Sequence, residues 1–250
     1  MVGFSSVIVP LYALLSGVAA HGSLKAVEVN GKKYMAWQIN ADPYEKGPLV
    51  RYARRVLNEG PVKDFTGKGI TCGDAGNQAA AGIIPVNAGD KVKLIWDQWG
   101  SSHSGPVMDY MAKCTGSDNC ASFKGDSGPV WVKIDQAGYD TKLNPPWASD
   151  RLGRQNATWT TTIPKSLAPG DYLLRHEILG LHVAGKRMGA QFYPTCVQIK
   201  LTSSGTANPK GIALPGAYQP DDKGILVELW RVNQGQVQYT PPGGPVWNGV

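Results

Sequence analysis

The chain has 250 residues, of which 25 are Lys or Arg and 19 are Asp or Glu, giving a formal charge of +6. The basic residues are scattered, and their densest groups are the pairs Lys32-Lys33 and Arg54-Arg55. No basic stripe emerges, which argues against a nucleic-acid partner. The 31 Gly and 18 Pro, together with few stretches of helical period, argue against a helical protein.

The first 20 residues predict a secretion signal. Residues 7–15 are apolar, and small residues stand at the minus-three and minus-one positions of a cleavage site after Ala20. No stretch of the chain reaches the roughly 18 apolar residues that a membrane span needs. We therefore expect a secreted, extracellular protein without a membrane partner. Cleavage would make His21 the amino terminus and leave 21–250, enough for one large all-β domain or two small ones.

Short β-rich runs recur along the rest of the chain. A run at 24–29 leads into Asn30-Gly31, a strong signal for a hairpin turn. The other predicted strands are 91–96, 130–134, 158–163, 172–178 and 197–202. Long irregular stretches separate these runs, so we expect an all-β sandwich with large loops that carry the function. No internal repeat or second domain is evident, and we expect no appended carbohydrate-binding module.

Four cysteines in a secreted chain predict two disulfide bonds, for which three pairings are possible. Cys114 and Cys120 bracket a short polar loop and resemble a local crosslink. Cys72 and Cys196 would then close a long loop. A glycosylation sequon follows at 156–158, which makes Asn156 a candidate glycosylation site on an exposed strand edge.

The chain contains four histidines. With a free α-amine, His21 would offer two nitrogen ligands to one metal, and His103, in a Gly/Ser-rich loop, could meet it in space. His176 and His182 do not have the spacing of H-E-x-x-H, which excludes the zincin helix motif. On a strand, both would share one face unless Gly180 introduces a bulge. The alternative is that they are ordinary buried histidines bonded to their neighbours.

The run 191–196 places Gln191 and Tyr193 on one strand face and Phe192 on the other. The two polar groups could satisfy each other or line a site. Two imidazoles, an amine and a tyrosine oxygen suit a tetragonal copper centre better than tetrahedral zinc. A hydrolase with paired carboxylates is disfavoured, because Glu177 and the scattered Asp residues offer no convincing pair.

Several motifs of the chain carry a resemblance to a known family. In chain order they are His21-Gly22 directly after the leader, 103–106, 170–182 and 189–196. Together they resemble the fungal copper-dependent lytic polysaccharide monooxygenases of auxiliary activity family nine, formerly glycoside hydrolase family sixty-one. The resemblance covers essentially the whole mature chain. Two departures are that Gly180 stands where the family commonly has Ala, and that a longer Pro/Gly-rich run follows Tyr239.

The resemblance implies a histidine brace that holds one copper ion. His21 would bind copper through its amine and one ring nitrogen, and His103 through a second imidazole. Tyr193 would occupy a distant axial position. Gln191 and His182 would donate hydrogen bonds to the oxygen co-substrate, and such outer partners tune a metal site.

The resemblance further implies an immunoglobulin- or fibronectin-like β-sandwich with a flat substrate-binding face. On that face Tyr44 and Tyr239 would stack on sugar rings. The implied activity is oxidative cleavage of cellulose or related β-1,4-glucans at C1 or C4. A monomer would use O₂ or H₂O₂ and an external electron donor, such as cellobiose dehydrogenase or a small reductant. A non-catalytic copper- or polysaccharide-binding protein with the same brace is the alternative. Gln191, His182 and Tyr193 disfavour it, because a pure carrier needs no oxygen-orienting groups.

Overall fold

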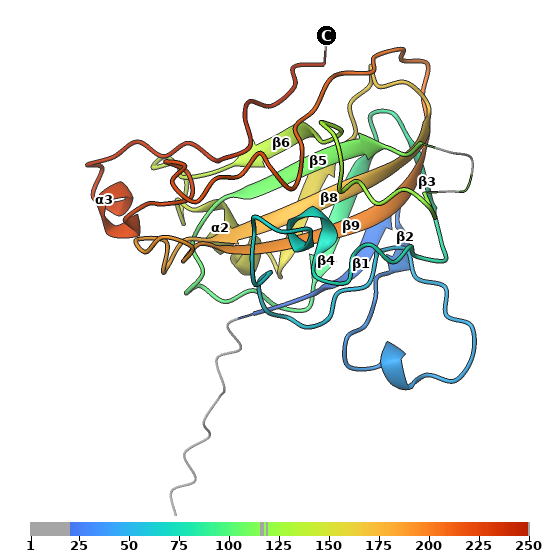
Figure 1. The fold of residues 1–250 in the computed structure, drawn as a ribbon, viewed down its shortest axis with the longest axis horizontal. Helices are drawn as coiled ribbons and strands as arrows, with labels where there is room; N and C mark the ends of the chain where they lie inside the picture. Colours follow the sequence, from blue (N-terminus) through green and yellow to red (C-terminus); the bar gives the residue numbers. More distant parts are fainter. Residues whose placement is uncertain (1–20, 116–117, 119, 250) are drawn as a thin grey trace, which may run out of the picture.

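The computed structural model describes residues 21–115, 118 and 120–249, which form two β-sheets packed face to face (Figure 1). The four-stranded sheet has the order β2-β1-β4-β7, and the five-stranded sheet has the order β3-β9-β8-β5-β6. Neighbouring strands are antiparallel, except that β3 and β9 run parallel. The strands are β1 (Leu24–Val29), β2 (Lys32–Met35), β3 (Ile84–Asn87), β4 (Lys91–Trp96), β5 (Val107–Lys113), β6 (Val132–Ala137), β7 (Thr158–Thr162), β8 (Gly170–Gly180) and β9 (Gln191–Thr202). The predicted all-β sandwich is confirmed.

The hairpin of β1 and β2 follows directly from its turn residues. Asn30 and Gly31 have φ angles of 50° and 78°, which an Asn-Gly pair tolerates and which the two-residue hairpin turn requires. The turn sets the register, so that Val29 pairs with Lys32. The hairpin turn predicted from the sequence is confirmed.

The interior strands of the five-stranded sheet are buried on both faces, and this explains why the sequence pattern missed β5. Val107 and Met111 of β5 pack between the two sheets, whereas Met108 and Tyr110 pack on the outer face under loops. A strand buried on both faces lacks the polar–apolar alternation that identifies a strand. The prediction therefore omitted β5. It also omitted β2 and β3, which have only four residues each. It also placed β6 too early, at 130–134.

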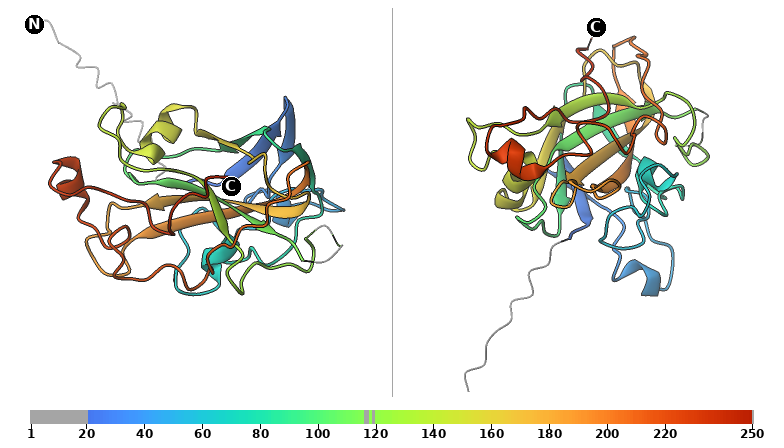
Figure 2. Two further views of the ribbon diagram at one scale, coloured as in Figure 1. Left: turned by 90° about the horizontal axis from the view of Figure 1, so that it is seen from above. Right: turned by 60° about the vertical axis from the view of Figure 1, so that its left-hand side comes forward.

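Four short helices lie in the loops, at the ends and outer face of the sandwich. They are η1 (Asp42–Tyr44), α1 (Gly69–Cys72), α2 (Ala148–Arg154) and α3 (Leu229–Asn233). In both views of Figure 2, α3 and η1 lie on opposite sides of the start of β1. No helix in the described ranges is long and apolar enough to cross a membrane. The predicted leader, 1–20, lies outside the described residues.

The two disulfide bonds follow the favoured pairing. Cys72 and Cys196 join α1 to β9 across 124 residues of chain, and Cys114 and Cys120 close a loop of six residues after β5. Closing a long loop restricts the unfolded chain, so the first bond stabilises the fold more than the second. Because Cys196 is three residues beyond Tyr193, this bond also anchors the part of β9 that leads to the candidate site.

Buried Lys133 fixes the C-terminal segment to the five-stranded sheet. Its Nζ donates to the carbonyl oxygens of Pro242 and Gly244, at 2.7 and 2.6 Å, and to Gln136 Oε1 at 2.8 Å. Burial lowers the pKa of Lys133 from 10.5 to about 8. Between these two values the unfolded chain binds more protons than the folded chain, so this lysine makes stability rise with pH.

Lys133→Met is expected to abolish that rise and to lower the unfolding temperature at pH 7. The reason for the second effect is that it leaves the buried Pro242 carbonyl group without its donor, which costs about 1–3 kcal/mol. Thermal unfolding of both proteins from pH 7.5 to 9.5 measures the two effects. An unchanged pH slope in the variant would contradict the account.

Candidate metal centre

The segment that leads into β1 is held against the residues that follow β4. The amide and the hydroxyl of Ser23 both donate to the carboxylate of Asp97, at 2.8 and 3.1 Å. The side-chain amide of Gln98 donates to the carbonyl oxygen of His21 at 2.8 Å. Glycine is needed at position 22, because a Cβ on Gly22 would lie 2.1 Å from the Gln98 carbonyl oxygen. These contacts fix the backbone of His21.

His103 lies in the loop between β4 and β5 and is 4% exposed. The hydroxyl of Ser149, in α2, donates to the His103 carbonyl oxygen at 3.0 Å, and the Ser102 hydroxyl lies 2.9 Å from Nδ1. The buried Nε2 has no hydrogen bond of normal geometry, although the Gln191 side chain approaches the ring. A buried ring nitrogen in this situation calls for a ligand.

The electrostatic surroundings keep His103 neutral. Burial, followed by the charges of His182 and His21, lowers the pKa of His103 from 6.5 to about 4. The pKa of His182 is also lowered, first by burial and then by His21. A neutral imidazole is the form of histidine that binds a metal ion, so the site is prepared for one at neutral pH.

The fold brings together all five of the residues that the sequence predicted for the metal and its surroundings. The ring centroids of His21 and His103 are 4.9 Å apart, and those of His21 and Tyr193 are 5.9 Å apart. The rings of His103 and His182 are 4.0 Å apart. The Tyr193 hydroxyl donates to Gln191 Oε1 at 2.8 Å. Four separate stretches of chain thus meet at one place.

Tyr193 presents a neutral phenol to this cluster. It is 4% exposed, and burial raises the pKa of its hydroxyl group well above the ordinary value. The Trp99 ring packs edge-on against it, with centroids 5.0 Å apart. A phenol that stays protonated is a weak oxygen ligand.

Comparison with known proteins decides the family of the chain. Residues 21–239 match the family model of Auxiliary Activity family 9, formerly GH61. The chain belongs to this family. It is 43% identical over 247 residues to the AA9 family lytic polysaccharide monooxygenase A of Gloeophyllum trabeum, covering 95% of this chain and 75% of that protein.

Two solved structures of the family are also similar to this chain. The extended catalytic domain of H. jecorina LPMO9A has a TM-score of 0.82 at 34% identity, covering 92% of each chain. A structure described as a cellulose-active polysaccharide monooxygenase from M. thermophila has a TM-score of 0.78 at 32% identity, covering 92% of this chain and 100% of that one. The resemblance seen in the sequence and the immunoglobulin-like sandwich are confirmed.

Membership of family 9 gives the general activity. The family consists of secreted, copper-dependent lytic polysaccharide monooxygenases, which cleave polysaccharides oxidatively. The donor atoms of this chain fit copper: two imidazoles, one of them with a buried and unsatisfied nitrogen, lie beside a neutral phenol. Within the described residues, no group of three or more His, Cys, Asp or Glu side chains could hold a metal ion.

His176 and His182 do not share one strand face, although their spacing allowed it. Strand β8 ends at Gly180, and His182 lies exposed in the turn that follows. His176 is fully buried between the sheets, where its Nδ1 lies 2.7 Å from Asp109 Oδ1. Its ring faces Trp96, with centroids 5.8 Å apart. His176 is therefore a buried, hydrogen-bonded histidine, and His182 belongs to the cluster.

The two tyrosines predicted to bind substrate have different surroundings. Tyr44, in η1, is 81% exposed. Tyr239 is half-buried: its hydroxyl donates to the Gly224 carbonyl oxygen at 2.9 Å, and its ring packs against Trp147. Their roles remain predictions. Asn156 is exposed in the turn before the edge strand β7, where a glycan would have room.

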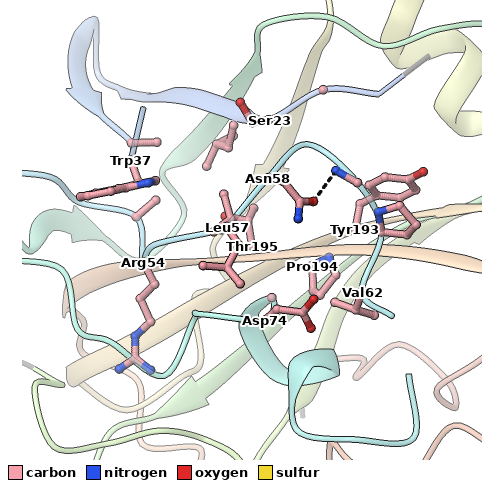
Figure 3. A pocket seen from close by; sticks show the side chains of 18 of the residues that line it. Ser23, Trp37, Arg54, Leu57, Asn58, Val62, Asp74, Tyr193, Pro194 and Thr195 are labelled. Carbon is pink, nitrogen blue, oxygen red and sulfur yellow. Dashed lines mark hydrogen bonds between the residues drawn. The ribbon is translucent and has the colours of Figure 1, made fainter. Parts of the chain in front are cut away.

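A hollow of about 540 Å³, including open solvent, lies beside the cluster (Figure 3). Trp37 and Leu57 are among the residues that line it, and Tyr193 borders it at one end. The guanidinium group of Arg54 points away from the hollow, toward the carbonyl oxygens of Gly76 and Cys120. Near Tyr193 the lining includes Asn58, Val62 and Pro194.

Three residues that hold the cluster were not among the predicted site residues. Asp97 and Gln98 directly follow a correctly predicted strand, and strand ends are where loops gather and carry function. Ser149 lies in the short helix α2, which no pattern in the sequence indicated. The end of the predicted strand could therefore have indicated Asp97 and Gln98, whereas nothing in the sequence indicated Ser149.

Proposed function

We propose that 21–250, released from the leader, form a copper-dependent monooxygenase that cleaves β-1,4-glucan chains, cellulose above all, at C1 or C4. The observation that carries the proposal is the cluster of two imidazoles and a phenol, with His103 and Tyr193 centroids 4.9 and 5.9 Å from His21. The family match supports it, because the match begins at residue 21, directly after the predicted leader. The likeness to a cellulose-active relative supports the choice of substrate.

Each predicted ligand has a defined part in this proposal. His21 would supply its α-amine and one ring nitrogen, His103 its buried Nε2, and Tyr193 its hydroxyl oxygen. Copper supplies one-electron redox chemistry with O₂ or H₂O₂, using electrons from an external donor. Because the Tyr193 proton is donated to Gln191, the phenol oxygen keeps its lone pairs for the metal.

Gln191 and His182 would handle the oxygen co-substrate. Gln191 uses Oε1 to accept from Tyr193, which leaves its amide hydrogens available as donors toward the open side of the cluster. The imidazole of His182, beside His103, can donate from one ring nitrogen and accept at the other. Together they would orient the co-substrate and hold a proton close to it.

The exposed face around the cluster would bind the polysaccharide. Tyr44 offers an exposed ring that can stack on a sugar, and Tyr239 would act from the C-terminal loop. The enzyme would act outside the cell as a monomer, glycosylated at Asn156. Its electrons would come from a partner such as cellobiose dehydrogenase or from small reductants.

Mass spectrometry of the products released from cellulose tests this function. The copper-loaded protein, given a reductant and O₂ or H₂O₂, is expected to release oxidised cello-oligosaccharides, and the site of oxidation distinguishes C1 from C4 attack. His103→Ala serves as the matched control, because it removes a ligand and leaves the exposed face intact. Release of only unoxidised sugars, or of none with copper occupancy verified, would rule out the proposal in favour of a binding protein.

The two glycines that border the cluster give a paired test of its geometry. Gly22→Ala is expected to weaken copper binding by about 10–100-fold, as the loss of a group that positions a ligand commonly does. The added methyl cannot fit against the Gln98 carbonyl oxygen and must displace His21. Gly180→Ala should leave copper affinity unchanged, because its Cβ would lie at ordinary contact distances of 3.5 Å from His103 and His182. Isothermal titration with copper measures both, and equal affinities would contradict the positioning role of Gly22.

A further inference from the structure

A second hollow is lined by His182 and Gly185, from the turn after β8, and by Trp230 and Asn233 of helix α3. It measures about 670 Å³, including open solvent. The two walls are joined, since the amide of Val227 donates to the Ala184 carbonyl oxygen at 3.0 Å.

Trp230 forms one side of this hollow and is 51% exposed. The other seven tryptophans of the chain are buried or half-buried. Helix α3, which carries Trp230, is anchored to the rest of the fold. Val232 is fully buried, and the Trp147 indole donates to Asn233 Oδ1 at 2.8 Å. A large aromatic ring on an anchored element, turned to solvent beside a hollow, is typical of a binding site.

The rest of the lining is polar and has spare hydrogen-bonding groups. The amide nitrogen of Asn233 remains available, because Trp147 uses only its oxygen. Glu228 is about half exposed, and its 3.6 Å pair with Arg231 leaves carboxylate oxygen sites free to accept. Gly185 keeps the hollow open, since a Cβ there would have only Glu228 Cγ near it, at 3.9 Å. An aromatic face beside hydroxyl-binding groups is the combination that a sugar ring requires.

We propose that this hollow is a subsite for one pyranose ring of a β-1,4-glucan, with Trp230 stacking on the ring and Glu228 and Asn233 binding its hydroxyl groups. The C–H groups on one face of a pyranose meet the negative face of the indole, as in other aromatic contacts. The inference rests on the proposed function. His182 borders both the hollow and the cluster. A sugar ring bound in the hollow would therefore lie beside the part of the glucan that is oxidised.

The hollow favours a glucan whose chain is not held flat in a crystal surface. A chain locked in a crystal surface cannot place one ring into a depression, whereas a soluble oligosaccharide or a branch sugar can. Both sources present the same chemistry, a single pyranose ring. Cellohexaose and a xyloglucan-derived oligosaccharide therefore form the two arms of the test: tighter binding of the first assigns the backbone, and tighter binding of the second assigns the branch.

The experiment measures binding of both oligosaccharides to the copper-loaded protein without reductant, so that no turnover occurs. Trp230→Ala is expected to weaken binding of at least one oligosaccharide by about tenfold, equivalent to about 1.4 kcal/mol. Trp230→Phe should recover most of the loss, because it restores an aromatic face. Thermal unfolding of each variant verifies that the fold is retained.

Gly185→Leu provides an independent second variant, which fills the hollow and leaves Trp230 in place. It should weaken binding of the same oligosaccharide as Trp230→Ala. Unchanged affinity of both variants for both oligosaccharides would overturn the subsite, even if oxidised products still form from cellulose. Absence of any oxidised product, with these binding losses observed, would instead contradict the oxidative function and leave the sugar site standing.

Discussion

A chain that carries one additional residue before His21 is expected to bind copper far more weakly and to release no oxidised sugars. The amine of His21 then becomes an amide, whose nitrogen lone pair is delocalised and cannot bind the metal. One of the three proposed nitrogen ligands would be lost, together with the chelate ring that it would make with the imidazole. The loss should exceed the about 10–100-fold that removal of an outer hydrogen-bond partner commonly costs.

Copper titration and product analysis of the extended and processed chains measure the effect. The fold should be unaffected, because Ser23, Asp97 and Gln98 hold the start of β1 through bonds that do not involve the amine. Equal unfolding temperatures without copper provide that control. Undiminished copper affinity in the extended chain would show that the amine is not a ligand, and cleavage after Ala20 would then serve export alone.

How far the sequence predicted the fold depended on how each strand is buried. Strands such as β1 and β4 alternate buried and exposed residues and were placed correctly. The central strand β5 is buried along nearly its whole length, so it carries no alternation to find. The hairpin at Asn30-Gly31 was predictable because few residues other than Asn and Gly adopt the required positive φ angles.

The residues predicted for the candidate site lie close together in the fold, but the sequence did not predict their geometry. Order and type of motifs identified His21, His103 and Tyr193, but the spacing of His176 and His182 suggested one continuous strand face. The strand instead ends at Gly180, where the chain turns, and only His182 reaches the cluster. What terminates β8 there depends on tertiary packing, since the Leu181 amide bonds back to the Ser104 carbonyl oxygen at 2.9 Å.

The buried charges beneath the outer face of the sheet could not be inferred from sequence. Glu177 was considered as a catalytic carboxylate and set aside for want of a partner. It is fully buried, where it forms an ion pair with Arg175 and accepts from the Tyr218 hydroxyl at 2.6 Å. Arg175 in turn donates to the Ile70 and Thr71 carbonyl oxygens, each at 2.8 Å, and so connects β8 to α1.

Glu177→Ala is accordingly expected to lower the free energy of unfolding by about 3–5 kcal/mol, the cost of removing one partner from a buried ion pair. The variant leaves the Arg175 guanidinium without its counter-charge and the Tyr218 hydroxyl without its acceptor. Asp221→Ala, which breaks the exposed pair with Arg187, is the matched control and should cost at most about 1 kcal/mol. Denaturant unfolding of the two variants and the parent protein measures both values.

The same pair of variants separates stability from chemistry. Because Glu177 contacts Arg175 and Tyr218 rather than the histidine cluster, folded Glu177→Ala should retain its copper affinity at low temperature. A carboxylate acting in catalysis would give the opposite result, with activity lost and stability kept. A loss of stability no larger than that of Asp221→Ala would mean that the Arg175 guanidinium is satisfied by the carbonyl oxygens of α1 alone, and that the ion pair is not what holds α1 to β8.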